Sequence, residues 1–131
     1  MTAITALFIE DDRMNRRVVR DMLDVAGATM VEAESAEIGL GLIEANDFDI
    51  VLVDLRMPGM DGITAIRHIR SRRDAKGRLP IIVVTADTAI DLRQRCLEAG
   101  ADDVIFKPVA MDALFDSMGR LLADGDEDEL I

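Results

Sequence analysis

The stretch IVLVDLRMPGMDG, residues 50–62, sets four apolar residues in a row and follows them at once with Asp54. An apolar run of this length is short for a helix, and its valine and isoleucine favour a strand that is buried on both faces. Pro58 and Gly59 then predict a turn. We therefore expect Asp54 at the end of a central strand, where the backbone changes direction.

Four other short apolar runs precede or follow this one, and helical patterns separate them. The expected strands are residues 5–9, 29–33, 49–53, 80–84 and 103–106. Between and after the runs, apolar residues recur every three or four positions, as they do in amphipathic helices. This alternation predicts an α/β fold, a doubly wound parallel five-stranded sheet with helices on both faces. The run at 29–33 contains Glu32 and is expected at an edge.

The length and charge of the chain limit its organisation and its partners. Its 131 residues suit one domain, expected over residues 1–123, with an acidic and flexible tail at 124–131. The formal net charge of −11 argues against nucleic-acid or anionic-membrane binding, because both depend on basic residues. No apolar run is long enough to span a membrane, and the single Cys96 cannot form an internal disulfide. A cytoplasmic location is expected.

Polar residues follow four of the five expected strands. They are Glu10, Asp11 and Asp12 after the first strand, Asp54 after the third, Thr85 after the fourth, and Lys107 and Pro108 after the fifth. Ligands of open parallel sheets bind outside the carboxyl ends of the strands, so we expect these side chains to form one site. Neighbouring carboxylates repel one another unless a cation lies among them, and oxygen ligands suit Mg²⁺. With Lys107 and Thr85 as an anion receptor, the pattern indicates phosphoryl transfer to an aspartate.

These motifs occur in the order found in one known family. The acidic pair, VDLRMPGMDG, the VTA that ends the fourth strand and the FKP after the fifth strand resemble the receiver domain of response regulators in two-component signalling. The resemblance covers roughly residues 4 to 122. It implies a flavodoxin-like or CheY-like sheet with the strand order 2-1-3-4-5.

The resemblance also implies a Mg²⁺ site. Asp11 and Asp54 would bind the ion directly, Glu10 would act through water, and the backbone carbonyl of Arg56 would complete the protein ligands. Asp12 falls one position too late for the acidic pair, and we expect it to cap the first helix.

The remaining site residues are expected to act on the phosphoryl group. Asp54 would be the phosphoacceptor and would attack the phosphorus of a phosphohistidine. Thr85 would hydrogen-bond a phosphoryl oxygen. Lys107 would pair with Asp54 before phosphorylation and with the phosphoryl group afterwards. As a hypothesis of our own, Arg56 and Asp87 flank this group, and their pairing obstructs the line along which water attacks the acyl phosphate.

A protein partner is expected to dock beside the site. By resemblance, a histidine kinase or a histidine phosphotransfer protein would contact Met14, Asn15 and Val18 on the first helix and the loop that contains Pro108. The phosphorylated chain would then relay the phosphoryl group or bind a downstream protein.

A site of this kind suits several functions. The leading one is a stand-alone receiver that is not an enzyme and assists only its own phosphorylation and autodephosphorylation. A variant is the receiver of a hybrid histidine kinase. An aspartyl phosphatase of the haloacid-dehalogenase type needs a second acid two residues after its nucleophile, where this chain has Arg56. A binding module that needs no phosphate would still bind its partner after Asp54→Asn.

Overall fold

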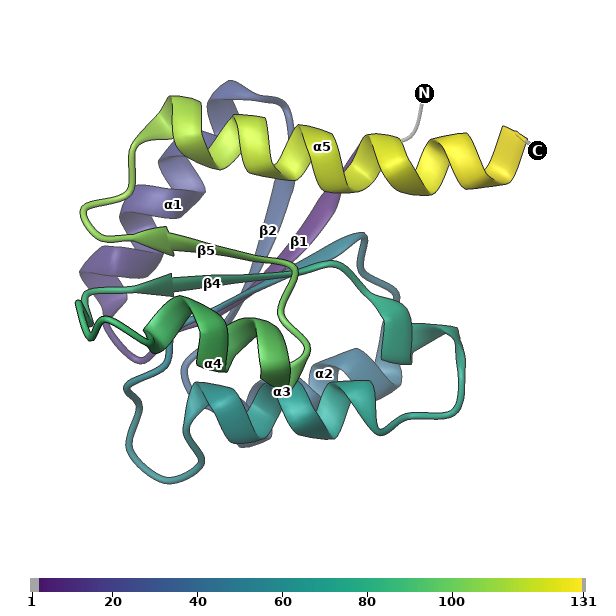
Figure 1. The fold of residues 1–131 in the computed structure, drawn as a ribbon. Coiled ribbons are helices and arrows are strands. Elements are labelled where there is room, and N and C mark those ends of the chain that lie inside the picture. The colour runs from purple at the N-terminus through teal and green to yellow at the C-terminus, as the bar shows by residue number, and fades with distance from the viewer. Residues whose placement is uncertain (1–2, 131) are drawn as a thin grey trace.

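The fold is a five-stranded parallel sheet with helices on both faces, as seen in the computed structural model (Figure 1). The structure describes residues 3–130, with side chains to residue 123. The strands are β1 (Thr5–Ile9), β2 (Thr29–Ala33), β3 (Ile50–Val53), β4 (Ile81–Thr85) and β5 (Asp103–Phe106). The helices are α1 (Arg13–Val25), α2 (Ala36–Ala45), α3 (Gly62–Arg70), the short 3₁₀ helix η1 (Ala75–Arg78), α4 (Leu92–Ala99) and α5 (Met111–Leu130).

The sheet has the expected strand order, β2-β1-β3-β4-β5. All neighbouring strands run parallel, so their carboxyl ends meet at one edge. The strand β2 lies at an edge, as Glu32 indicated, and β3 lies in the middle with its four residues fully buried. The predicted fold class is therefore confirmed. The strands β3 and β4 begin one residue later than predicted.

The helices form one layer on each side of the sheet. Figure 1 shows α1 and α5 on one face and α2, α3 and α4 on the other. Alternate strand residues point to opposite faces. In β3, for example, Leu52 packs with Leu23 of α1 and Leu114 of α5, whereas Val53 packs with the cluster that contains Ile66 of α3. Each face therefore has a hydrophobic cluster of its own.

Short polar side chains and glycines define several helix ends. Asp12 caps α1 as predicted, because its side chain accepts hydrogen bonds from the backbone N–H groups of Met14 and Asn15. Gly27 and Gly100 follow α1 and α4 with φ angles of 76° and 119°, in the left-handed region that favours glycine. Asp91 precedes α4 without a capping hydrogen bond from its side chain.

The carboxylate of Asp103, the first residue of β5, joins this strand to two helices. Its Oδ1 atom lies 3.2 Å from Arg93 Nη1 of α4, and its Oδ2 atom lies 3.3 Å from Arg120 Nη2 of α5. The buried hydroxyl of Ser117 and the backbone N–H of Val104 also donate hydrogen bonds to this carboxylate. Asp103 therefore fastens α4 and α5 to the strand between them.

The last helix is longer than the sequence indicated. It continues past residue 123 and reaches Leu130. The predicted flexibility of residues 124–131 concerns a segment whose side chains, together with all of Ile131, lie outside the described residues, and it stays a prediction. Over residues 3–130, none of the helices combines the length and the apolar character needed to cross a membrane.

Candidate functional site

The polar residues after β1, β3, β4 and β5 converge at the carboxyl edge of the sheet. The backbone N–H of Asp54 donates to the carbonyl of Ile9 at 2.9 Å, which fixes the end of β3 beside the end of β1. On the other side, the backbone N–H of Lys107 donates to the carbonyl of Thr85 at 2.7 Å. The sheet thus positions both the expected nucleophile, Asp54, and the expected positively charged side chain, Lys107.

Three carboxylates gather at this edge. One oxygen each from Glu10, Asp11 and Asp54 can be chosen so that all lie within 4.8 Å of one another. Asp11 is exposed, whereas Glu10 and Asp54 are buried. Among the described residues, Glu10 Oε2 is the one buried side-chain oxygen or nitrogen without a hydrogen-bond partner. An unpartnered oxygen beside two further carboxylates fits a hard cation such as Mg²⁺.

Lys107 balances part of this negative charge, but mainly at a different carboxylate from the one expected. Its Nζ atom lies 2.6 Å from Glu10 Oε1 and 3.7 Å from Asp54 Oδ2. Burial raises the pKa of the Glu10 carboxyl, and the neighbouring Asp54 raises this pKa further, while Lys107 opposes both effects. Glu10 is also the more deeply buried of the two carboxylates, with 1% of its side chain exposed against 8% for Asp54.

Thr85 ends β4 and is fully buried at the same edge. Its hydroxyl oxygen accepts a hydrogen bond of 3.0 Å from the backbone N–H of Asp87. The hydroxyl proton therefore stays available for an acceptor at the site.

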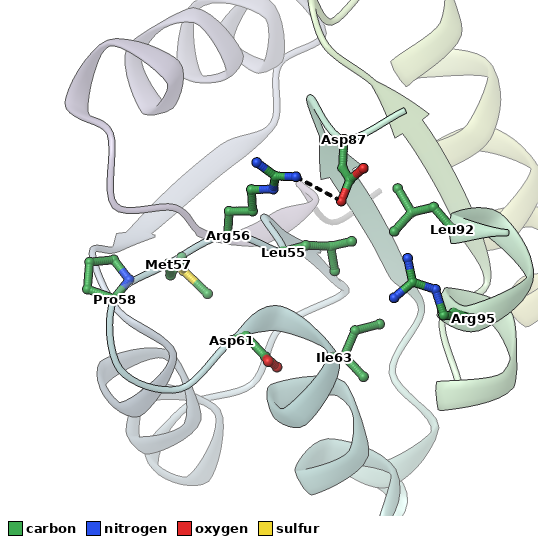
Figure 2. Close-up of a pocket in the computed structure, with 9 residues that line it drawn as sticks. All are labelled: Leu55, Arg56, Met57, Pro58, Asp61, Ile63, Asp87, Leu92 and Arg95. Atoms are coloured by element: carbon green, nitrogen blue, oxygen red, sulfur yellow. Dashed lines mark hydrogen bonds and ion pairs between the residues drawn. The ribbon is translucent and has the colours of Figure 1, made fainter. Parts of the chain in front are cut away.

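Arg56 and Asp87 meet above this edge, as the hypothesis on their pairing required. Arg56 Nη2 lies 3.3 Å from Asp87 Oδ2, and the arginine side chain is 77% exposed. Figure 2 shows the pair at one edge of a pocket between the loop after β3 and α4, with Asp61 and Ile63 across from it and Arg95 on the side of α4. The pKa of Asp87 lies below its ordinary value because its carboxylate accepts a hydrogen bond from the backbone N–H of Ala89 and pairs with Arg56.

The expected docking residues lie on one side of the site. Met14 and Val18 are exposed on α1, with 70% and 44% of their surface accessible. Asn15, Val18 and Pro108 line a pocket of about 130 Å³ that also contacts Lys107. Residues of α1 and of the loop after β5 thus form one surface next to Lys107.

Three residues that support the site were missed in the sequence. The side chain of Arg16 donates a 2.7 Å hydrogen bond to the backbone carbonyl of Glu10, and Glu37 accepts one from the loop after β3. Gly62 allows the start of α3 to pass close to Asp54, because a Cβ atom there would lie 2.5 Å from the Asp54 carbonyl oxygen. The spacing of Gly62 within RMPGMDG was a signal. Arg16 lies six residues after its partner Glu10, and Glu37 lies 23 residues before its partner Met60, but neither spacing belongs to a motif that predicts the contact.

Comparison with known proteins agrees with this geometry. The family model described as "Response regulator receiver domain" matches residues 6–118. The chain is 34% identical over 125 residues to the virulence sensor protein BvgS of Bordetella pertussis, a match that covers 92% of this chain and 10% of BvgS. It is 36% identical over 118 residues to the response regulator protein FleR of Pseudomonas aeruginosa, which covers 90% of this chain and 24% of FleR.

A solved structure shares the fold throughout. The receiver domain of the sensor histidine kinase PA1611 from Pseudomonas aeruginosa PAO1 superimposes with a TM-score of 0.84 and 30% sequence identity, over 93% of this chain and 99% of that domain. That crystal structure holds a magnesium ion in its active-site cleft. The chain therefore spans a small part of the curated relatives that it matches and nearly all of the isolated domain.

Proposed function

The chain belongs to the response regulator receiver domain family of two-component signalling, and from this membership we propose that it accepts a phosphoryl group on Asp54. The donor is a phosphohistidine of a sensor kinase or of a histidine phosphotransfer protein. The observation that carries the proposal is the meeting of Asp54 with two further carboxylates and Lys107 at one sheet edge.

The transfer would use the Asp54 carboxylate as the nucleophile. As one of its oxygens bonds to phosphorus, the P–N bond of the phosphohistidine breaks, and its electron pair returns to the imidazole nitrogen of the donor. The Thr85 hydroxyl is placed to donate to one phosphoryl oxygen, and the Lys107 ammonium is placed to pair with another. Lys107 would have to leave Glu10 to do so, over a shift that its long side chain permits.

The acidic residues fit a magnesium site that supports this step. When bound, Mg²⁺ supplies positive charge that offsets the charge of the phosphoryl oxygens and of the attacking carboxylate. Asp11 and Asp54 would hold it directly, and Glu10 would do so through water. The backbone carbonyl of Arg56 would add a fourth contact. The unpartnered Glu10 Oε2 and the magnesium ion in the PA1611 receiver support this assignment.

The kinase or phosphotransfer partner is proposed to dock over α1 and the loop after β5. This surface offers exposed apolar side chains at Met14 and Val18 beside the pocket formed with Asn15 and Pro108. An apolar contact next to the nucleophile would bring the phosphohistidine to Asp54 while covering the reacting atoms from water. The phosphorylated domain then acts through protein–protein contacts.

A turnover enzyme is disfavoured by the same geometry. An aspartyl phosphatase needs a general acid two residues after its nucleophile, and here Arg56 occupies that position and pairs with Asp87. We therefore propose a phosphoacceptor signalling domain that assists only its own phosphorylation and autodephosphorylation. Hydrolysis of an external phosphomonoester would contradict this reading.

The test is phosphorylation of the purified chain with a small phosphodonor such as acetyl phosphate in the presence of Mg²⁺. Intact-mass spectrometry should show the gain of one phosphoryl group, and a metal chelator should prevent it. The matched control is Asp54→Asn, which keeps the shape of the side chain and should stay unmodified. A phosphorylated Asp54→Asn variant would overturn the assignment of the acceptor.

Partner choice is tested separately by phosphotransfer profiling against the histidine kinases of the source organism. One kinase is expected to transfer much faster than the others, and Val18→Asp should slow that transfer without affecting phosphorylation by acetyl phosphate. Equal effects on both donors would argue against docking over α1. A partner that binds Asp54→Asn as well as the phosphorylated chain would favour a binding module instead.

A further inference from the structure

The backbone of the loop between β3 and α3 makes few hydrogen bonds to the rest of the described chain. At its base, the backbone N–H of Gly62 donates to the carbonyl of Leu55 at 3.0 Å. Between these points, residues 56–60 include Arg56, the proposed source of a carbonyl ligand. Over the described part of the chain, a single hydrogen bond joins the backbone of residues 56–60 to another element. Its donor is the Met60 N–H and its acceptor is Glu37 Oε1, 3.0 Å away.

Glu37 is held ready for this contact by the start of α2. It is the second residue of the helix, after Ser35, whose hydroxyl oxygen caps the first turn. A carboxylate in the first turn is favoured by the partial positive charge of a helix N-terminus. The pKa of Glu37 lies below its ordinary value because its carboxylate accepts hydrogen bonds from its own backbone N–H and from that of Met60. The side chain is therefore ionised and oriented toward the loop.

The backbone at the tip of the loop passes close to the Glu37 carboxylate. Gly59 has a φ angle of 80°, which a glycine adopts at little cost, and a Cβ atom there would lie 3.3 Å from Glu37 Oε1. Pro58 restricts the backbone just before it, and the Met57 side chain is buried in the core. Because residues 57 and 58 have little freedom, fixing Met60 also restricts the direction of the Arg56 carbonyl.

We propose that Glu37 is a positioning residue of the site: by holding the Met60 N–H, it fixes the loop that carries Arg56 and so sets the affinity for Mg²⁺. This inference rests on the proposed function, because it assigns the Arg56 carbonyl to the metal. Glu37 itself touches neither the ion nor the phosphoryl group. Its contribution is transmitted through the backbone of residues 56–60.

The test compares Glu37→Ala with Glu37→Gln in the full chain. Both variants remove the charge, but glutamine keeps an oxygen that can accept the Met60 hydrogen bond. Glu34→Ala is the control for charge alone, because Glu34 is an exposed acid just before the same helix. Isothermal titration with Mg²⁺ should give an affinity roughly tenfold weaker for Glu37→Ala, while Glu37→Gln and Glu34→Ala stay within a few-fold of the parent chain.

Amide hydrogen exchange provides the second readout. The Met60 amide should exchange faster in Glu37→Ala than in Glu37→Gln, while the amides of β3 and β4 stay protected in both variants. Equal Mg²⁺ affinities of Glu37→Ala and Glu37→Gln would overturn the proposal, as would unchanged exchange at Met60. If Mg²⁺ binding follows the expected order but acetyl phosphate does not modify Asp54, the proposed phosphoacceptor function fails and the positioning role stands.

Discussion

Lys107 and Glu10 form the closest ion pair of the site, with 2.6 Å between Nζ and Oε1. The same ammonium lies 3.7 Å from Asp54 Oδ2. The Lys107 ammonium thus already pairs with two of the carboxylates that are proposed to bind Mg²⁺. Two positive charges that use the same carboxylates oppose each other's binding.

Lys107→Ala should therefore strengthen Mg²⁺ binding, by roughly tenfold, because the competing charge is gone. Phosphorylation by acetyl phosphate should become slower in the same variant, since the phosphoryl oxygens lose their positively charged partner. Titration calorimetry and intact-mass kinetics measure the two effects. Arg17→Ala removes one positive charge from an exposed position on α1 and serves as the control. An unchanged Mg²⁺ affinity in Lys107→Ala would contradict the competition.

The Arg56–Asp87 pair is predicted to lengthen the life of the phosphoryl group. Arg56→Ala and Asp87→Ala should each lose the phosphoryl group several-fold faster, because water then reaches the acyl phosphate more freely. The double variant should add little to either single change, since both remove one interaction. Loss of the phosphoryl group is followed by intact mass after removal of the donor.

Arg95→Ala is the control for this prediction. Arg95 lines the same pocket but pairs with Asp91, 3.3 Å away, and not with Asp87. It should leave the phosphoryl lifetime close to that of the parent chain. If neither Arg56→Ala nor Asp87→Ala shortens the lifetime, the pair has no part in shielding Asp54.

Gly62→Ala should destabilise the chain by roughly 1–3 kcal/mol, the usual cost of forcing atoms into filled space. The added Cβ atom would lie 2.5 Å from the Asp54 carbonyl oxygen and 2.8 Å from Leu55 Cα, and both belong to the backbone. Gly41→Ala in α2 is the matched control, because a Cβ atom there meets nothing within 4 Å. It should stabilise the chain by about 0.5–1 kcal/mol. Urea unfolding followed by circular dichroism compares the two, and equal stabilities would refute the predicted crowding.

The free energy of unfolding of the chain should depend on pH through the ionisation of Asp103. Burial by itself raises the pKa of this carboxyl, but hydrogen bonds from Ser117 and Val104 and the pairing with Arg93 outweigh burial, so the pKa lies below its ordinary value of 3.8. A carboxyl with a lowered pKa stabilises the folded chain above the ordinary value, and this contribution is lost as the pH falls through the folded pKa. Stability due to Asp103 should thus be complete at neutral pH and decline below about pH 4.

Asp103→Asn should lower the free energy of unfolding at pH 7 by roughly 1–3 kcal/mol, the range for hydrogen bonds to a charged group. The difference from the parent chain should shrink below about pH 4, as the parent carboxyl also becomes neutral. Asp116→Asn is the control, because Asp116 is 74% exposed and its pair with Arg120 should contribute less than about 1 kcal/mol. A difference that stays constant from pH 7 to pH 3 would exclude ionisation of Asp103 as the cause.

The strands were accessible from sequence because each strand is a short apolar run bounded by polar residues, whereas their order was predicted from the resemblance to receiver domains. The strands β1, β2 and β5 have the predicted bounds. Asp12 was separated from Asp11 by its position, and the structure shows it capping α1. Local patterns of this kind depend on neighbours in the chain, so the sequence displays them directly.

Contacts between residues that are far apart in the chain were harder to predict from the sequence. The preference of Lys107 for Glu10 over Asp54 depends on the placement of three side chains that follow different strands. The hydrogen bond from Met60 to Glu37 joins residues 23 positions apart, and no spacing rule relates them. The extension of α5 to Leu130 was missed because its last turns are acidic and lack an apolar stripe.

The sheet divides the buried side chains into two groups, and substitutions in the two groups should have additive effects on the free energy of unfolding. Ile69 belongs to the cluster that α2, α3 and α4 cover, and Leu114 belongs to the cluster that α1 and α5 cover. The energetic effects of separated sites with no shared neighbours add to within about 0.5 kcal/mol. A protein engineer can therefore tune the thermal tolerance of the domain from the α5 side and leave the packing beneath the Arg56 loop unaltered.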